Sequence, residues 1–215
     1  MCTRSMRLRL LQQTSRGVCQ NVTYDEIEHL YHITHTDNLT SILNEGLLSH
    51  AHMMGRECRR IDDQAVQDRR ASRKTPTNRR LHEYAVLYLN PRNAMMYKRK
   101  ALHEQLCIVA FNKELLLQPG VLLTDRNAAS QPRYLEAPAG LEELDRNDVF
   151  RVDWNDADPF VKDRKRKLIM AEVLTPDIVP ARYVDGIIVS NPTTLTHVEQ
   201  MCNIGVHIRP HLFFR

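Results

Sequence analysis

The stretch that decides the fold is Tyr-His-Ile-Thr-His-Thr-Asp-Asn-Leu at residues 31–39. The residues leading into it are apolar enough for a short β-strand. Leu39, Ile42 and Leu43 then follow at the i, i+3, i+4 spacing of a buried helix face. Gly46 suits the left-handed position that ends many helices. The sequence therefore predicts a strand that turns directly into a helix.

The corner between this strand and helix carries more polar side chains than a turn needs. Thr36 or Asp37 can cap the helix by accepting a hydrogen bond from a free backbone N–H group. Free N–H groups at a helix start also favour phosphates, so the corner is a candidate anion site. The alternative is a capped helix beside a hydrogen-bonded core histidine, and the stretch alone favours neither interpretation.

Length and composition indicate one domain. At 215 residues and 42% hydrophobic, the chain can bury one good core, which we expect over residues 24–215. Residues 1–23 contain four arginines and no acidic residue, and we expect a poorly ordered basic tail there rather than a transit peptide. Five scattered cysteines without a Cys-x-x-Cys pair favour free thiols and a cytoplasmic location. No apolar run is long enough to span a membrane.

The formal net charge of +4 is concentrated in two basic clusters, at 56–80 and 162–167. Such clusters are most often solvated surface, but two in one domain favour an anionic ligand such as a dinucleotide or nucleic acid. The seven glycines show neither Rossmann nor P-loop spacing, which excludes those two nucleotide sites. His29, His32 and His35 would not converge from a strand and a turn, so we expect no metal.

Strands and helices are interspersed along the chain without regular alternation. This favours an α+β domain over a doubly wound parallel sheet. The predicted strands after the first one lie at 85–89, 106–111, 121–123, 168–174, 186–190 and 206–214. The predicted helices after the first one lie at 94–100, 159–167 and 193–201.

Glu172 is the second unusual residue of the sequence. If 168–174 is a strand, its alternation places Glu172 between the apolar Met170 and Leu174 on one face. A buried carboxylate without a partner is costly. Glu172 therefore either faces water on an edge strand or points into a cleft toward a ligand.

The order of short motifs resembles the DarT family of bacterial DNA ADP-ribosyltransferase toxins, from about Leu30 to the C-terminus. The first motif is the stretch at 31–39, and the others follow in family order. They are Gln-Asp-Arg-Arg at 67–70, Leu-His-Glu-Tyr at 81–84, Leu-Tyr-Leu-Asn-Pro-Arg-Asn-Ala-Met-Met-Tyr at 87–97, Leu-Thr-Asp-Arg-Asn at 123–127 and Ala-Glu-Val-Leu at 171–174.

This resemblance implies an ADP-ribosyltransferase-like fold, with two small packed β-sheets, peripheral helices and a cleft for NAD as co-substrate. It also implies single-stranded DNA as acceptor, gripped by a loop over about 125–166, and a macrodomain-type antitoxin as partner. The implied catalytic residues are Arg70 and Glu172. The implied NAD-binding residues are His32, Ile33, Thr34, Ser41, Ser49 and Arg70.

The chemistry of these residue types fits the implied roles. Breaking the nicotinamide–ribose bond builds positive charge on the ribose, which the Glu172 carboxylate can stabilise through a ribose hydroxyl. We expect His32 to donate a hydrogen bond to the adenosine-side ribose. Arg70 is a poor base, and we expect it to clamp the NAD phosphates or to polarise the target base. Arg69 and Arg73 compete for the place of Arg70.

The acceptor is less well defined by the sequence. Tyr134, Phe150 and Trp154 are candidates for stacking on unpaired bases, although core packing is an alternative for each. Asn-Ala-Met-Met-Tyr at 93–97 and Ile-Met-Ala-Glu at 169–172 resemble the guanine-modifying branch of the family more than the thymine-modifying one. Two alternatives stay open: a transferase acting on RNA or protein, and a non-catalytic nucleotide-binding module.

Overall fold

The computed structural model describes residues 20–215. Residues 1–19, which make up most of the expected basic tail, lie outside the described residues. In the last part of that tail, Asn21 forms a β-bridge with Asp145 and Val22 is fully buried in the main core. The packed part of the chain therefore begins before residue 24.

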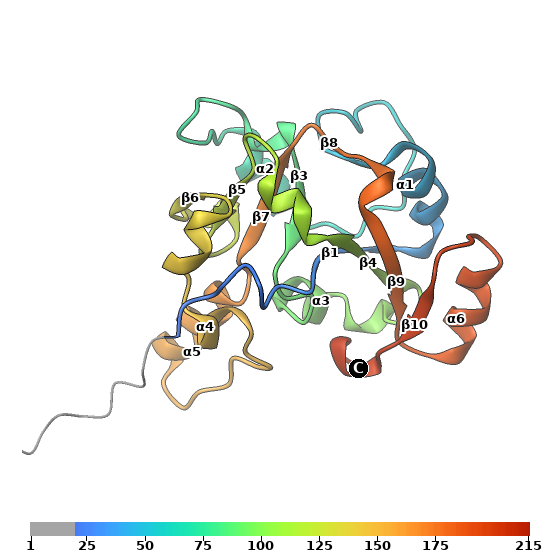
Figure 1. The fold of residues 1–215 in the computed structure, drawn as a ribbon. Coiled ribbons are helices and arrows are strands. Elements are labelled where there is room, and N and C mark those ends of the chain that lie inside the picture. The colour runs from blue at the N-terminus through green and yellow to red at the C-terminus, as the bar shows by residue number, and fades with distance from the viewer. Residues whose placement is uncertain (1–19) are drawn as a thin grey trace, which may run out of the picture.

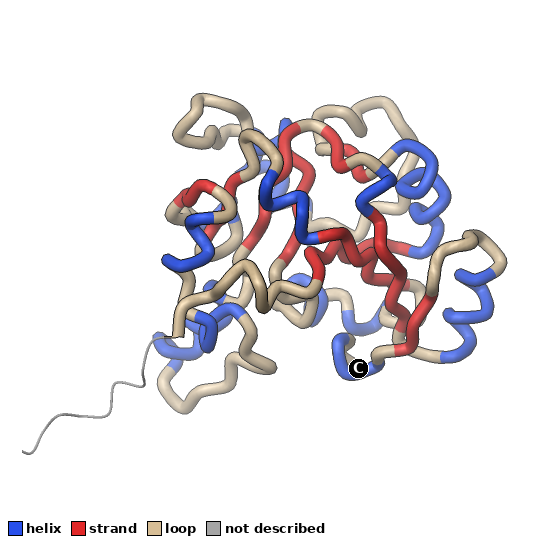
Figure 2. Tube along the Cα trace, viewed as in Figure 1, coloured by secondary structure: helices blue, strands red, loops and turns tan. Residues whose placement is uncertain are grey.

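The described residues form an α+β fold, as predicted, in which strands run through the middle and helices lie at the periphery (Figures 1 and 2). The strands are β1 (His29–His35), β2 (Leu47–Leu48), β3 (Tyr84–Tyr88), β4 (Leu106–Asn112), β5 (Leu122–Thr124), β6 (Tyr134–Glu136), β7 (Glu172–Pro176), β8 (Ile178–Val179), β9 (Val184–Val189) and β10 (Val206–Ile208). The helices are α1 (Leu39–Glu45), α2 (Gln64–Ala71), α3 (Ala94–Lys98), α4 (Arg146–Val149), α5 (Pro159–Leu168) and α6 (Pro192–Glu199). None of these helices is both long and apolar enough to cross a membrane.

Eight of the strands form one sheet in the order β10-β9-β4-β1-β3-β7-β5-β6, and β2 pairs with β8 separately. The large sheet is nearly divided in two. β1 pairs with β4 along its whole length, but it pairs with β3 only at Tyr31 and Tyr88. The expected pair of small sheets therefore occurs as two four-stranded halves joined by a single residue pair. We call this junction between β1 and β3 the seam.

The main core contains buried residues from both halves of the sheet and so connects them. It is built from the buried apolar faces of the central strands, including Leu30 of β1, Leu87 of β3, Val109 of β4 and Val173 of β7. A second cluster around Ile33, Tyr88 and Met170 also contains residues of both halves, and its strand residues alternate with those of the main core, so it packs on the opposite face of the sheet. Burial of this apolar surface is the main favourable contribution to folding.

Two predicted strands differ from the structure. At 168–174 the chain first completes α5 and turns, and β7 begins only at Glu172. The alternation that we expected across Met170, Glu172 and Leu174 therefore holds only for Glu172 and Leu174, because Met170 lies outside the strand. The predicted strand at 206–214 ends at Ile208, because Pro210 starts a short 3-10 helix (Pro210–Leu212) and has no N–H for a sheet.

The corner at 31–39 contains the predicted strand and helix, but its cap is a different residue. His35 occupies the cap position of the 3-10 turn Thr36–Asn38, and its ring Nδ1 accepts a hydrogen bond from the Asp37 N–H at 3.2 Å. Thr36 and Asp37 therefore do not cap the helix. Gly46 ends α1 with a φ of +90°, where a side chain would meet the backbone of Val179 in β8.

Candidate functional site

A cleft of about 1270 Å³ opens where the two halves of the sheet separate. Its walls come from β1, β3, α2, α3 and the first residue of β7, and the segment 53–63 crosses it. Nine Lys and Arg side chains line the cleft against five Asp and Glu. The cleft lining therefore carries an excess of positive charge, which favours an anionic ligand.

His32 lies in the seam between β1 and β3. Continued pairing would place Ile33 opposite Val86, but the Val86 carbonyl instead accepts a hydrogen bond from the His32 ring Nδ1 at 2.9 Å. Because a carbonyl only accepts, Nδ1 carries the proton, and burial lowers the pKa of His32. In the neutral ring Nε2 is therefore an acceptor. A neutral ring with Nδ1 committed to Val86 has no N–H left to donate, so the structure gives no support to our expectation that His32 donates to a ribose hydroxyl.

Thr34 also lines the cleft, and its hydroxyl is held from the start of α1. The Asn38 side chain donates to Thr34 Oγ1 at 3.0 Å and to the Arg59 carbonyl at 2.9 Å. Asn38 Oδ1 in turn accepts from the Arg59 N–H at 2.8 Å. Asn38 thus connects β1 to the segment that crosses the cleft, a role that its helix-start position did not indicate.

The other three residues expected beside the dinucleotide are placed differently from one another. Ile33 lines the cleft but belongs to the second core cluster. Ser41 is exposed on α1 and lines the cleft. Ser49 is fully buried and is absent from the lining, and its hydroxyl is hydrogen-bonded to His52 Nδ1 at 2.9 Å. The structure therefore gives no support to Ser49 as an NAD contact.

The opposite wall of the cleft contains a buried ion pair between α2 and β7. Arg70 Nη1 donates to Glu172 Oε2 at 3.0 Å, and the two side chains are 5% and 1% exposed. Arg70 occupies the last turn of α2, where the helix dipole favours a cation. The neighbouring Arg69 is exposed and Arg73 lies beyond the helix, so Arg70 is the arginine that reaches Glu172.

Each member of this pair keeps one buried polar atom without a partner. In the described part of the chain four such atoms occur, and two of them are Arg70 Nη2 and Glu172 Oε1. An unsatisfied buried polar atom costs free energy unless something binds it. Both residues line the cleft, and a ligand that supplies a hydrogen-bond donor and an acceptor there would satisfy the two atoms once a small side-chain movement uncovers them.

The surroundings of Glu172 fix which oxygen is free. Oε2 accepts from Arg70 and from the Ala128 N–H at 3.2 Å, which leaves Oε1 unbonded. The Glu172 N–H is held by Thr124 Oγ1 at 3.2 Å. Burial raises the pKa of the Glu172 carboxyl, while the charge of Arg70 acts in the opposite direction. Since β7 lies between β3 and β5, the edge-strand interpretation of Glu172 is wrong.

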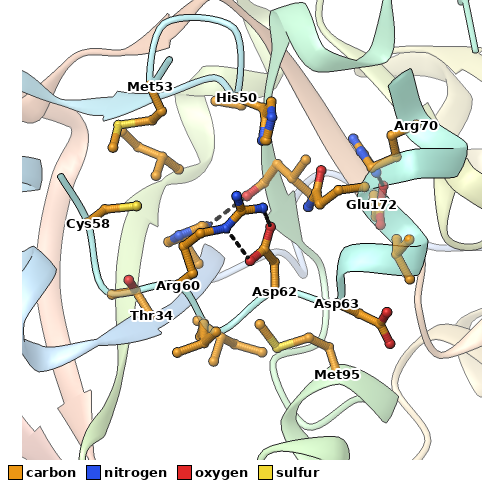
Figure 3. Close-up of a pocket in the computed structure, with 18 of the residues that line it drawn as sticks. Thr34, His50, Met53, Cys58, Arg60, Asp62, Asp63, Arg70, Met95 and Glu172 are labelled. Carbon is orange, nitrogen blue, oxygen red and sulfur yellow. Dashed lines mark hydrogen bonds and ion pairs between the residues drawn. The ribbon is translucent and has the colours of Figure 1, made fainter. Parts of the chain in front are cut away.

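A second ion pair crosses the middle of the cleft (Figure 3). Arg60 Nε and Nη2 donate to the two carboxylate oxygens of Asp62 at 3.0 and 2.8 Å. Arg60 lowers the pKa of Asp62 through these bonds. Both residues are partly exposed, at 49% and 29%. Nothing in the sequence indicated this pair beyond the general basic character of 56–80.

The residues expected to hold DNA are less clearly assembled. Arg166 and Lys167, at the end of α5, line the rim of the cleft. Tyr134, Phe150 and Trp154 do not line it. Phe150 packs on the main core, and Trp154 packs edge-on against Tyr97 at a ring distance of 5.5 Å. In residues 20–215 no three His, Cys, Asp or Glu side chains lie together as a metal site.

Comparison with known proteins yields one family. A family model described as "ssDNA thymidine ADP-ribosyltransferase, DarT" matches residues 31–214. The chain is 34% identical over 202 residues to a DNA ADP-ribosyl transferase–DNA ADP-ribosyl glycohydrolase fusion protein of Thermosipho africanus, covering 89% of the chain and 50% of that protein.

Two solved structures are similar. The structure of Thermosipho africanus DarTG in complex with ADP-ribose matches with a TM-score of 0.75 and 32% identity, over 86% of this chain and 51% of the other. The structure of Thermus sp. 2.9 DarT in complex with NAD⁺ matches with a TM-score of 0.73 and 25% identity, over 89% of this chain and 100% of the other. The chain thus spans about half the length of the fusion relative.

Proposed function

This chain belongs to the DarT family, and on that premise we propose that it transfers ADP-ribose from NAD to a base of single-stranded DNA. The observation that carries the proposal is the Arg70–Glu172 pair, with one buried unsatisfied atom on each residue in a cationic cleft. Such atoms are costly in a folded protein, and active sites are where such costs are commonly found. Relatives solved with ADP-ribose and with NAD⁺ support the choice of ligand.

The roles of the residues follow from the free atoms of the site. Glu172 Oε1 accepts a hydrogen bond from a ribose hydroxyl, and its charge stabilises the positive charge that builds as the bond to nicotinamide breaks. Nicotinamide leaves with the bonding electron pair. A ring nitrogen of the acceptor base then bonds to the same ribose carbon, and the base releases its proton to solvent. Arg70 holds Glu172 and offers Nη2 to the ligand.

The β1 side of the cleft binds and orients NAD. His32 accepts a hydrogen bond from a ribose hydroxyl through Nε2, because Nδ1 is already committed to Val86. Thr34 and Ser41 line the same cleft and complete the NAD contacts, with Ile33 as the apolar neighbour. The cationic rim formed by Arg166 and Lys167 guides the DNA strand toward the site.

The acceptor base is guanine or thymine. The family description names thymidine, whereas two departures of this sequence favour guanine. Both departures include a methionine that lines the cleft, Met95 in one case and Met170 in the other. In this proposal the two methionines contact the acceptor or the nicotinamide side of NAD.

The biological setting is that of a toxin–antitoxin pair. We assign the chain the role of toxin, acting in the cytoplasm, with a macrodomain-type antitoxin that removes the modification. The fusion of a related transferase to a DNA ADP-ribosyl glycohydrolase supports this pairing. The single catalytic domain of this proposal includes Asn21 and Val22 as well as residues 24–215, because these two residues pack with the rest of the fold.

Mass spectrometry of modified oligonucleotides tests the activity. The full chain is incubated with NAD and a pool of single-stranded DNA oligonucleotides that together contain every short sequence context. We expect a mass gain of one ADP-ribose on the members with the preferred base, and fragmentation identifies that base. Matched RNA pools and a Glu172→Gln variant serve as controls. No gain on any DNA, or an equal gain on RNA, would contradict the proposal.

A further inference from the structure

We propose that Arg60 binds the pyrophosphate of NAD, and that Asp62 competes with the pyrophosphate for the same guanidinium and so limits the affinity of the cleft. This inference rests on the proposed function, because it assigns part of the same cleft to part of the same ligand. Asp62 is then an affinity-setting residue rather than a structural one.

The segment that carries the two residues is fixed on both sides. Asn38 and Arg59 exchange two hydrogen bonds of 2.8 and 2.9 Å at its start. Arg99 donates to the carbonyls of Ile61 and Asp62 at its end, the second at 2.6 Å. Ile61 is buried in the second core cluster. The backbone at 59–62 is therefore held in place, and the side chains of Arg60 and Asp62 extend from it into the cleft (Figure 3).

The chemistry of the pair fits an exchange of anions. The fork of Arg60 holds both oxygens of Asp62, and the same fork geometry holds two oxygens of a phosphate. Partly exposed ion pairs contribute little to stability, so one anion can replace another at small cost. Only Ile61 separates the two residues in sequence. Replacement of Asp62 by a phosphate on Arg60 therefore needs only side-chain rotation.

Four other cations of the cleft are held by partners of their own, whereas Arg59 and Arg69 line it without a side-chain partner among the described residues. Arg70 is bound to Glu172 and is buried. Arg99 holds the two backbone carbonyls, Lys98 pairs with Asp63, and Arg56 pairs with Glu45 at the rim. Arg60 differs from these because it lies in the middle of the cleft, between the wall that carries Thr34 and the wall that carries Arg70 (Figure 3). A dinucleotide that contacts both walls has its pyrophosphate between its two ends, where Arg60 lies.

Two neighbouring acidic residues supply a matched test. Asp62→Asn and Asp63→Asn each remove one negative charge from the same segment, and asparagine keeps the helix cap that Asp63 provides to α2. Asp62→Asn releases Arg60, whereas Asp63→Asn releases Lys98, so the two variants compare two freed cations of the same cleft. Binding of NAD, ADP-ribose and adenosine to the full chain is measured by calorimetry for both variants, together with Arg60→Ala, Arg60→Lys and the rim control Arg56→Ala.

We expect Asp62→Asn to tighten NAD and ADP-ribose binding several-fold more than Asp63→Asn does, with adenosine unaffected because it has no phosphate. Arg60→Ala weakens both phosphate ligands by roughly tenfold, and Arg60→Lys recovers only part of the loss. Thermal unfolding confirms that each variant is folded.

Two outcomes overturn the inference. If the unaltered protein binds NAD but Asp62→Asn behaves like Asp63→Asn, or Arg60→Ala like Arg56→Ala, then Arg60 is not the phosphate ligand and the proposed function stands. If the unaltered protein binds neither NAD nor ADP-ribose, the proposed function fails and the inference fails with it.

Discussion

On the β1 side of the cleft no buried side-chain nitrogen or oxygen of the strand lacks a partner in residues 20–215, whereas on the β7 side Arg70 and Glu172 each keep one such atom without a partner. His32 and Thr34 are held by Val86 and Asn38 before any ligand contact is considered. The β1 side is arranged to bind, with the orientation of its groups already fixed. The β7 side carries an electrostatic cost that a reacting ligand can remove. The comparison supports a proposed function in which binding and chemistry are divided between the two halves of the sheet.

The largest expected effect is on the chemical step when the β7 side loses its charge. Glu172→Gln keeps the size and an oxygen of the side chain but cannot stabilise positive charge. We expect turnover at saturating NAD to fall about a thousandfold, while the dissociation constant for NAD changes only a few-fold. Steady-state kinetics with an oligonucleotide substrate and calorimetry measure the two quantities. An equal loss in both would mean that Glu172 binds NAD rather than acting on the reaction.

The free-energy cost of burying the Arg70–Glu172 pair can be measured through the free energy of unfolding. Glu172→Leu leaves the Arg70 guanidinium buried without its partner, and we expect it to lower the free energy of unfolding by about 3–5 kcal/mol. The double variant Arg70→Met/Glu172→Leu removes both charges and should be about as stable as the unaltered protein, or more stable, although inactive. Chemical denaturation compares the two. A double variant as unstable as the single one would show that the pair stabilises the fold.

The β1 side should respond in affinity rather than in rate. In His32→Asn the side-chain amide can still donate to the Val86 carbonyl, but no acceptor remains at the position of Nε2. We expect NAD to bind about tenfold more weakly, with turnover at saturation nearly unchanged. A large fall in turnover without loss of affinity would contradict the assignment of NAD binding to the β1 side and of the chemical step to the β7 side.

The smallest expected effect is a shift in pH dependence. Burial raises the pKa of Glu172, so this group takes up its proton at a higher pH than an ordinary glutamate, which titrates near pH 4.3. Because the ionised form is the active one, turnover falls as the pH is lowered through the raised pKa. The acid limb of turnover should therefore lie above about pH 4.3.

His32→Asn provides the control for this limb. Burial lowers the pKa of His32, which keeps the ring neutral below the ordinary histidine range. The acid limb of turnover should therefore persist in His32→Asn. If the acid limb disappears in His32→Asn, the group that titrates is His32 on the β1 side and not Glu172 on the β7 side.

The positions of site residues that lie on strands or at helix ends could largely be predicted from the sequence. His32, Thr34, Arg70 and Glu172 come from segments far apart in sequence, and the ordered motifs indicated that they belong together. The structure brings all four into one cleft. Local patterns could place them on a strand or at a helix end, but not at the same seam, because the seam depends on which strands pair.

Residues whose position depends on distant contacts were not predictable. The segment at 59–62 has no periodicity, and its path is fixed by Asn38 and Arg99, which lie more than twenty residues away in sequence. The apolar run at 168–171 was assigned to a strand because short apolar runs fit a strand and a helix end equally well. Ser49 was expected at the ligand, but it is buried beside His52.

The single residue pair at the seam has a mechanical consequence. Each half of the sheet is stiff along its own hydrogen-bonded strands, but across the seam the backbone is joined only at Tyr31 and Tyr88, with the His32 side chain beside them. Deformation of the molecule should therefore concentrate at this line, and the width of the cleft can change without breaking either half. A ligand held by both walls acts there as a removable cross-link. Ligand binding should therefore slow amide hydrogen exchange in β1 and β3, at backbone positions that the ligand does not contact.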